Sequence, residues 1–293
     1  MSMIKISMLK KSYGKTHALN GIDLEVPQGE VFGFIGPNGA GKSTTIRILL
    51  GLLRKNSGNV TLLGGDPWKD SVELHKRLAY VPSDVNLWPN LTGGEVIDLL
   101  GRLRGSYSAE RRAELLKRFN LDPSKKCRTY SKGNRQKVAL IAALVSDVEL
   151  LIFDEPTSGL DPLMESVFQQ CVIEAKNSGK TVFLSSHILA EVETLCDRIS
   201  IIKEGKIVEQ GTLPELRHLT GTIVIAETER PVDGLSAFSS IRNLERSGRR
   251  VCLSVDNAQL SSVLAYLASC GVTALQSAPP TLEELFMRHY SNE

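Results

Sequence analysis

The segment GPNGAGKSTT, residues 36–45, combines glycines, one lysine and hydroxyl groups at the expected start of a helix. It matches the spacing G-x-x-x-x-G-K-[ST], in which backbone N–H groups surround phosphate oxygens and glycines leave room for them. The helix start adds positive charge, the Lys42 ammonium would contact the β- and γ-phosphates, and the Ser43 hydroxyl would bind magnesium. The sequence therefore predicts a nucleoside triphosphate site formed by Gly36, Pro37, Asn38, Gly39, Ala40, Gly41, Lys42, Ser43 and Thr44.

Two adjacent carboxylates, Asp154 and Glu155, follow an apolar run that has the pattern of a buried strand. A parallel strand beside the phosphate-binding strand would bring both acids to the same edge of the sheet. We expect Asp154 to hold magnesium, directly or through water, and Glu155 to accept a proton from the attacking water or to orient it. Many strands simply end in solvated acids, so this interpretation depends on the phosphate-binding segment.

His187 follows a third apolar run, residues 181–186, and precedes an expected helix. A lone histidine more often serves packing or lies on the surface. Here a third strand ending at the common edge would bring the imidazole within reach of a γ-phosphate. We therefore predict that Glu155 and His187 are the catalytic residues.

Around these residues the sequence predicts an α/β fold. The run VFGFI before the phosphate-binding segment indicates a strand, and RISIIKEGKIVEQG indicates a hairpin with a Glu-Gly turn. Residues 1–85 and 146–220 are predicted to form the nucleotide core, with a β-rich N-terminal part and a parallel sheet. Apolar spacing near 3.6 predicts helices in an insertion at about residues 86–145.

The pattern changes after residue 220, which predicts a small C-terminal α/β appendage at residues 221–293. TIVIAETE and RRVCLSV resemble strands, AQLSSVLAYLASCG a helix, and TLEELFMRHY a final helix. Nothing in the appendage suggests catalysis. A regulatory or dimer-supporting role and a purely structural role both stay open.

Bulk composition excludes several classes of protein. The 293 residues are 42% hydrophobic and 23% charged, as in ordinary globular proteins, and the net charge of +2 gives no support to nucleic-acid binding. Five cysteines without a CxxC pair indicate neither a disulfide framework nor a zinc site, which fits a reducing cytosol. The N-terminus lacks the apolar run of a signal peptide, and no apolar stretch approaches the roughly 18 residues of a membrane span.

These pieces in this order resemble the ATP-binding cassette (ABC) family of transport ATPases over residues 3–220. The decisive segment is SKGNRQKVALIAALVSDVELLIFDEPTSGLD, because an LSGGQ-like motif opens a helix shortly before the acidic strand in that family. Ser131, Gly133 and Asn134 fall in this motif. The resemblance implies that Ser131, the amide of Gly133 and the helix start contact ATP held by an opposite subunit, so that two chains complete each site.

Other roles are implied by the same resemblance. Tyr13 is similar to the aromatic residue that stacks on adenine, although simple packing stays open as an alternative. Residues 158–161 match the loop through which the two subunits communicate, and Asp161 is counted among the nucleotide-binding residues. The segment SSHILAEVETLCDRISIIKEGKIVEQGT is similar to the family's histidine switch and the strands after it.

The chain also departs from the family pattern. Ser83, followed by Asp84, stands where the family usually has a glutamine that reaches the metal and the attacking water. Because the side chains of Ser83 and Asp84 do not span the same distance as a glutamine, we do not expect Ser83 to coordinate the metal directly. A water molecule or Asp84 would take the place of the glutamine. Lys132 replaces the first glycine of the LSGGQ-like motif and Asn134 its glutamine. Such departures, together with PSDVNLWPNLTGGE and PPTLEELFMRHY, resemble the drug and antibiotic exporter branch.

The function implied is that of an ATP-binding and hydrolysing subunit of an ABC transporter. With ATP and Mg²⁺, two such subunits would associate, as a homodimer in the simplest case, and separate after hydrolysis. This cycle would drive a permease that is a separate membrane polypeptide, so the chain would lie at the inner face of the cell membrane. Residues 81–91 are the predicted docking surface, with Leu87, Trp88 and Leu91 as exposed apolar candidates.

Three alternatives stay open. An importer ATPase would have the same motifs, since the direction of transport resides mainly in the permease. A non-transport ABC ATPase acting on ribosomes or chromosomes fits less well, because the chain has one cassette and no sustained heptads. An unrelated kinase with the same phosphate-binding loop would leave residues 131–136 and His187 unexplained. The sequence does not identify the cargo.

Overall fold

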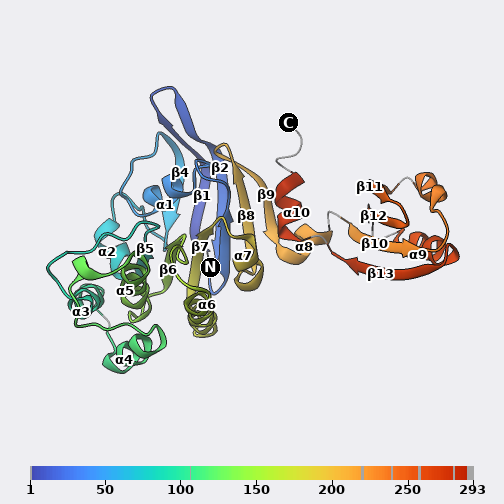
Figure 1. Ribbon diagram of the computed structural model, residues 1–293. Coiled ribbons are helices and arrows are strands. Elements are labelled where there is room, and N and C mark those ends of the chain that lie inside the picture. Colours follow the sequence, from blue (N-terminus) through green and yellow to red (C-terminus); the bar gives the residue numbers. More distant parts are fainter. Residues whose placement is uncertain are drawn as a thin grey trace. The chain divides into compact units, whose positions relative to one another are not determined.

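The computed structural model of the protein describes residues 2–105, 107–218, 221–238, 240–256, 259–279 and 281–288. The chain divides into two compact units, Met1–Gln210 and Gly211–Glu293, which Figure 1 shows along the chain in blue to orange and in orange to red. The division falls earlier than the boundary at residue 220 that the sequence suggested, because helix α8 (Leu213–His218) groups with the second unit. Residue 220 itself lies outside the described residues.

The first unit begins with an antiparallel sheet of strands β1 (Ser2–Tyr13), β2 (Thr16–Pro27) and β4 (Ser57–Leu62), in the order β2-β1-β4. β1 and β2 form a hairpin in which Tyr13 pairs with Thr16. Gly14 takes a φ of 58° in the turn, a conformation that glycine adopts at little cost. This sheet is the β-rich N-terminal part that the sequence predicted.

The second sheet of this unit has six strands in the order β5-β6-β7-β3-β8-β9. The pairs from β5 to β8 are parallel, and β3 and β6 consist entirely of buried residues, as expected for a parallel sheet covered on both faces. Their carboxyl ends lie at one edge, since Asp154 pairs with Ser185 and Ile35 with Ser186. The strands are β3 (Val31–Ile35), β5 (Leu78–Val81), β6 (Leu150–Asp154), β7 (Thr181–Ser186), β8 (Arg198–Lys203) and β9 (Lys206–Thr212).

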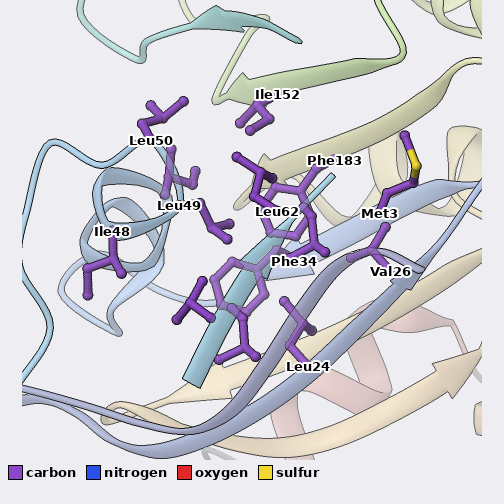
Figure 2. Packing of buried hydrophobic residues seen from close by; sticks show 14 of the residues in the cluster. Met3, Leu24, Val26, Phe34, Ile48, Leu49, Leu50, Leu62, Ile152 and Phe183 are labelled. Atoms are coloured by element: carbon purple, nitrogen blue, oxygen red, sulfur yellow. The ribbon is translucent and has the colours of Figure 1, made fainter. Parts of the chain in front are cut away.

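Successive residues of β3 face opposite sides of the sheet. Phe32 and Phe34 belong to the cluster of buried residues that joins the two sheets and helix α1 (Lys42–Leu49), and Figure 2 shows Phe34 packed near Phe183 and Leu62. Each such buried side chain contributes about 1.5–3 kcal/mol. Gly33 faces the other layer, where an added Cβ would lie 2.8 Å from Val192 of helix α7 (Leu189–Leu195).

The insertion between β5 and β6 is helical. Helix α3 (Gly93–Leu103) begins with a capping box in which Thr92 and Glu95 bond each other's backbone N–H. Helix α4 (Ala109–Arg118) begins after the cap residue Ser108, and a short 3₁₀ helix, η1 (Cys127–Thr129), precedes α5 (Lys132–Leu144). Helix α5 is almost wholly buried beyond its first turn and packs between α3 and the edge strand β5 (Figure 1).

Helices α2 (Ser71–Lys76) and α6 (Pro162–Asn177) flank the sheets of this unit. Helix α2 lies beside β5, and α6 packs on β7 and α7. Phe153 at the end of β6 meets Phe168 of α6 edge to face, with ring centroids 5.2 Å apart. The five cysteines are free. Within the described residues, no helix has the length and apolar character that crossing a membrane requires.

The second unit is built on an antiparallel sheet in the order β11-β12-β10-β13. Its strands are β10 (Thr222–Thr228), β11 (Ile241–Ser247), β12 (Arg250–Val255) and β13 (Val272–Ala278). Helix α9 (Leu260–Ser269) packs on β10 and β13, and the 3₁₀ helix η2 (Asp233–Ala237) precedes β11. Helix α10 (Leu282–Arg288) follows the sheet; the last two residues of the helix predicted to end at Tyr290 lie outside the described residues.

Candidate functional site

The loop between β3 and α1 forms a cradle of backbone atoms. An added Cβ on Gly36 would meet the carbonyl oxygen of Ile202, and one on Gly41 would lie 2.9 Å from the carbonyl oxygen of Ala18. Gly41 also takes a φ of 117°, which side-chain-bearing residues rarely adopt. Glycine is therefore required at both positions for the loop to pack this closely on its neighbours, and the loop leads into the N-terminus of α1, where backbone N–H groups can bind phosphate.

Lys42 turns its ammonium into this loop. Its Nζ donates to the carbonyl oxygens of Gly36 at 2.7 Å and Pro37 at 3.2 Å, and lies 3.7 Å from Oε1 of Glu155. Burial lowers the pKa of Lys42, and the charges of Glu155 and Asp154 oppose that effect. The lysine therefore places a positive charge at the centre of the cradle.

Ser43 and Asp154 face each other across the carboxyl edge of the sheet. The Ser43 hydroxyl donates to Oδ2 of Asp154 at 3.1 Å, and the Ser185 hydroxyl also lies close to this buried carboxyl, whose Oδ1 has no hydrogen bond of good geometry among the described residues. Burial is the main cause that raises the pKa of Asp154. A hydroxyl oxygen beside an unpaired carboxylate oxygen is a donor set that suits Mg²⁺, which takes few protein ligands and completes its shell with phosphates and water.

The described residues contain no group of three or more His, Cys, Asp or Glu side chains able to hold a metal ion by themselves. A magnesium ion at Ser43 and Asp154 would therefore depend on the phosphates of a nucleotide for its other ligands. This fits the position of both residues beside the cradle.

Glu155 and His187 meet at the same edge. Oε1 of Glu155 lies 3.3 Å from Nδ1 of His187, and the backbone N–H of Glu155 donates to the carbonyl oxygen of Ser185 at 2.8 Å. Glu155 takes a φ of 50°, which is uncommon for a residue with a side chain. A carboxylate and an imidazole in contact can accept a proton and orient a water molecule.

A second cluster forms where α5 begins. The Ser131 hydroxyl accepts from the backbone N–H of Asn134 at 3.3 Å and so caps the helix. Gly133 lies against the loop after β6, since an added Cβ would come within 2.5 Å of the carbonyl oxygen of Gly159. Lys132 donates to the hydroxyl of Ser158 at 2.9 Å. The LSGGQ-like segment and the loop 158–161 of the same chain are thus in direct contact.

Two predicted residues, Tyr13 and Asp161, lie outside both clusters. Tyr13 is 48% exposed at the tip of the β1–β2 hairpin, where the Lys11 ammonium lies 5.2 Å from its ring centre. Asp161 caps α6 by accepting from the N–H of Met164 at 3.0 Å. The structure thus brings Lys42, Ser43, Asp154, Glu155 and His187 together, and Ser131, Gly133 and Asn134 separately.

The residues that replace the usual glutamine follow the edge strand β5. Ser83 is half-buried, and Asp84 is exposed and accepts from the side-chain amide of Asn86 at 3.3 Å. Gln136, which the sequence analysis placed in the segment 131–136 without a role, is buried in α5 and donates to the carbonyl oxygen of Pro156 at 2.8 Å. It stands between Arg135 and Lys137, so nothing in the sequence marked it as the buried one of the three.

A phosphate-binding loop and an acidic strand end that meet at one edge of a parallel sheet, with a helical insertion between β5 and β6, are the features of an ATPase of the P-loop class. The family model for ABC transporters matches residues 19–158. YhaQ, an ABC transporter ATP-binding protein of Bacillus subtilis, is 33% identical, with 97% of each chain covered. The chain belongs to the family of ABC transporter ATP-binding proteins.

Two further comparisons agree. The daunorubicin resistance ATP-binding protein DrrA3 of Streptomyces coeruleorubidus is 35% identical and covers 97% of this chain, with 94% of its own length matched. The dimeric post-hydrolysis structure of the ATP-binding cassette MJ0796, bound to ADP and Pi, is 29% identical with a TM-score of 0.65, over 72% of this chain and 99% of that one. The predicted family and α/β fold class are confirmed, and the chain is a transport-coupled ATPase subunit that binds ATP.

Proposed function

We propose that two copies of this chain bind two ATP molecules between them and power export of a drug-like or antibiotic-like compound through a separate permease. ATP hydrolysis is supported by one observation: five predicted site residues lie together at one edge of the sheet, namely Lys42, Ser43, Asp154, Glu155 and His187. Export is supported by the full-length match to a protein named for daunorubicin resistance. The chain would work at the inner face of the cell membrane, held there by the permease.

The chain's own residues would act as follows. The backbone of residues 36–41 and the ammonium of Lys42 bind the phosphates, and Ser43 and Asp154 would hold Mg²⁺, which neutralises charge on the phosphate oxygens. Glu155 accepts a proton from the attacking water or orients it. His187, 3.3 Å from Glu155, fixes that carboxylate and contacts the γ-phosphate side of the site.

The separation of the two clusters within one chain supports a dimer, which we propose to be a homodimer. Ser131, Gly133 and Asn134 lie at a capped helix start, and the positive end of a helix favours phosphate. In the proposed dimer this surface contacts the ATP held in the partner's cradle, with residues 158–161 beside it. Tyr13 would stack on adenine, since its ring is exposed at the hairpin tip.

The energy required is modest. Shifting a two-state permease from 1:99 to 99:1 takes about 5.5 kcal/mol of differential binding. A hydrogen bond to a charged group contributes about 1.5–3 kcal/mol. A few bonds made only in the closed dimer would therefore supply the shift, and hydrolysis would reverse it.

The permease would dock near residues 81–91. Trp88 is 52% exposed in this segment, while Leu87 and Leu91 are half-buried, so Trp88 is the main apolar contact that it offers. A groove lined in part by Leu52, Val72 and Leu103, all exposed, lies between the end of α1, α2 and α3 and offers a second apolar surface. A cytoplasmic segment of the permease with apolar side chains would fit this region.

Replacing Glu155 by glutamine tests the proposal. Glu155→Gln keeps the shape but loses the proton acceptor, so we expect ATP turnover to fall by about 10²-fold or more while ATP binding is retained. ATP should then trap a dimer, measured by sedimentation. Glu73→Gln, on the exposed face of α2, is the matched control and should behave as the unmodified chain. Normal hydrolysis by Glu155→Gln would remove Glu155 from its assigned role.

A further inference from the structure

Glu191 lies in the first turn of α7 and is only 4% exposed. Its Oε2 accepts from the hydroxyl of Ser186 at 2.8 Å, and the same hydroxyl oxygen accepts from the backbone N–H of Ile188 at 3.0 Å. Ser186 and Ile188 are the two neighbours of His187. The carboxyl group therefore fixes the Ser186 hydroxyl, which in turn holds Ile188 on the other side of the imidazole.

The same carboxyl group also faces the loop after β6. The Thr157 hydroxyl, which is buried, approaches it, while Oε1 has no hydrogen bond of good geometry among the described residues. Thr157 belongs to a tight turn in which Ser158 donates to the carbonyl oxygen of Glu155 and Leu160 to that of Thr157. This turn leads to Gly159, which contacts the start of α5.

We propose that Glu191 is a positioning residue that links the loop 157–160 to the His187 turn, so that contact at the subunit interface sets the position of His187 beside Glu155. The proposal rests on the proposed function of the same site. Glu191 acts through Ser186 and Thr157 and binds no nucleotide itself. The Thr157 hydroxyl lies close to this carboxyl, and a small shift of the loop would improve the geometry of its bond to Oε1.

Charge supports this role. The pKa of Glu191 is raised to about 7, chiefly by burial and also by the charge of Glu165 of α6, while the Ser186 and Thr157 hydroxyls act in the opposite direction. The other ionisable groups on this side are the buried Cys196 thiol and the Lys176–Asp197 ion pair, and β3 and β7 bring no charged residue. At pH 8 the carboxyl is mostly ionised, and its hydrogen bonds are then charge-assisted and about twice as strong as neutral ones.

The test compares Glu191→Gln with the unmodified full-length chain at pH 8 and pH 6. Because the amide keeps the shape but cannot carry the charge, we expect kcat to fall about tenfold at pH 8 with KM for ATP unchanged. The ratio of the two kcat values should approach one at pH 6, where Glu191 is mostly protonated. Other titrating groups affect both proteins and cancel in the ratio.

Thermal unfolding separates positioning from a structural role. The pKa of Glu191 is raised on folding, so its contribution to stability is lost as pH rises through about 7. Glu191→Gln should therefore melt at or above the temperature of the unmodified chain at pH 8. Glu193→Gln, two residues on in the same helix, is the control and should change neither kcat nor its pH dependence.

Ser186→Ala breaks the same link from its other end. We expect a similar loss of kcat at pH 8 and no further loss in the double variant. Unchanged kcat in Glu191→Gln at pH 8, a ratio constant with pH, or additive losses in the double variant would overturn the proposal. None of these results affects the proposed function, which fails only if Glu155→Gln hydrolyses ATP normally.

Discussion

At the scale of single residues, Asp154 shows how burial prepares a carboxyl group for a cation. One oxygen is bonded to Ser43, the other has no hydrogen bond of good geometry among the described residues although the Ser185 hydroxyl lies nearby, and burial raises the pKa. A buried acceptor without a partner is costly, by about 1–3 kcal/mol. A divalent ion bound together with the nucleotide would remove that cost and favour the ionised form.

Asp154→Asn tests this interpretation. An amide keeps the bond from Ser43 but carries no charge, so the concentration of Mg²⁺ needed for half-maximal nucleotide binding should rise by at least about tenfold. Nucleotide binding without Mg²⁺ should change little. Fluorescent-nucleotide titrations with and without Mg²⁺ provide the measurement, and Asp147→Asn, which changes an exposed side chain, is the control. Equal Mg²⁺ dependence in both variants would exclude Asp154 as a ligand.

At the scale of elements, the start of α5 and the loop after β6 are packed so closely that only glycine fits between them. An added Cβ on Gly133 would lie 2.5 Å from the Gly159 carbonyl oxygen, which is backbone and cannot rotate away. Lys132 adds a bond to Ser158 across the same contact. The two segments proposed to form the subunit interface therefore move together.

Gly133→Ala should push these segments apart. Overpacking of this kind costs about 1–3 kcal/mol, and we expect ATP-driven dimerisation and hydrolysis to fall together while ATP binding by the single chain is retained. Sedimentation with ATP and a turnover assay measure the two effects. Lys137→Ala in the same helix is the comparison, and an equal loss in that variant would mean general damage to α5.

The sequence was sufficient to predict those strands whose residues form a continuous apolar run. VFGFI and TVFLSS are continuous apolar runs, and both are buried parallel strands that end at the site. IRNLERS and VTALQSA lack such runs, so β11 and β13 were missed; they are held by pairing with β12 and β10. Glu191 was missed because its burial depends on α7 packing against β3, β7 and α6, which no spacing in the sequence reveals.

At the scale of the whole molecule, the proposed work requires contact with a permease. Trp88 and Trp68 are the two tryptophans of the chain and are similarly exposed, at 52% and 46%. They lie in different surroundings, since the Arg54 guanidinium lies 4.5 Å from the Trp68 ring and Trp88 belongs to the proposed docking segment. Comparing variants of the two tryptophans therefore distinguishes a specific docking contact at Trp88 from a general effect of removing an exposed aromatic side chain.

Trp88→Ala should weaken association with the permease about tenfold, because aromatic anchors carry much of the binding energy at interfaces. Turnover by the isolated subunit should be unaffected. Recovery of a multispanning protein from membranes by the tagged chain, with each variant, is the measurement. Trp68→Ala is the matched control, and equal recovery with both variants would place the docking surface elsewhere.

Lys42 already has partners within its own loop, and this affects how ATP would be captured. Its Nζ donates hydrogen bonds to the Gly36 and Pro37 carbonyl oxygens. Phosphate oxygens would therefore compete with those carbonyls and not with bulk water. Much of the ammonium's dehydration is thus completed during folding of the chain. When ATP binds, its phosphate oxygens would replace the two carbonyl oxygens as acceptors of the Lys42 hydrogen bonds. Because the lysine side chain is already held in place, little of its conformational entropy would be lost on binding.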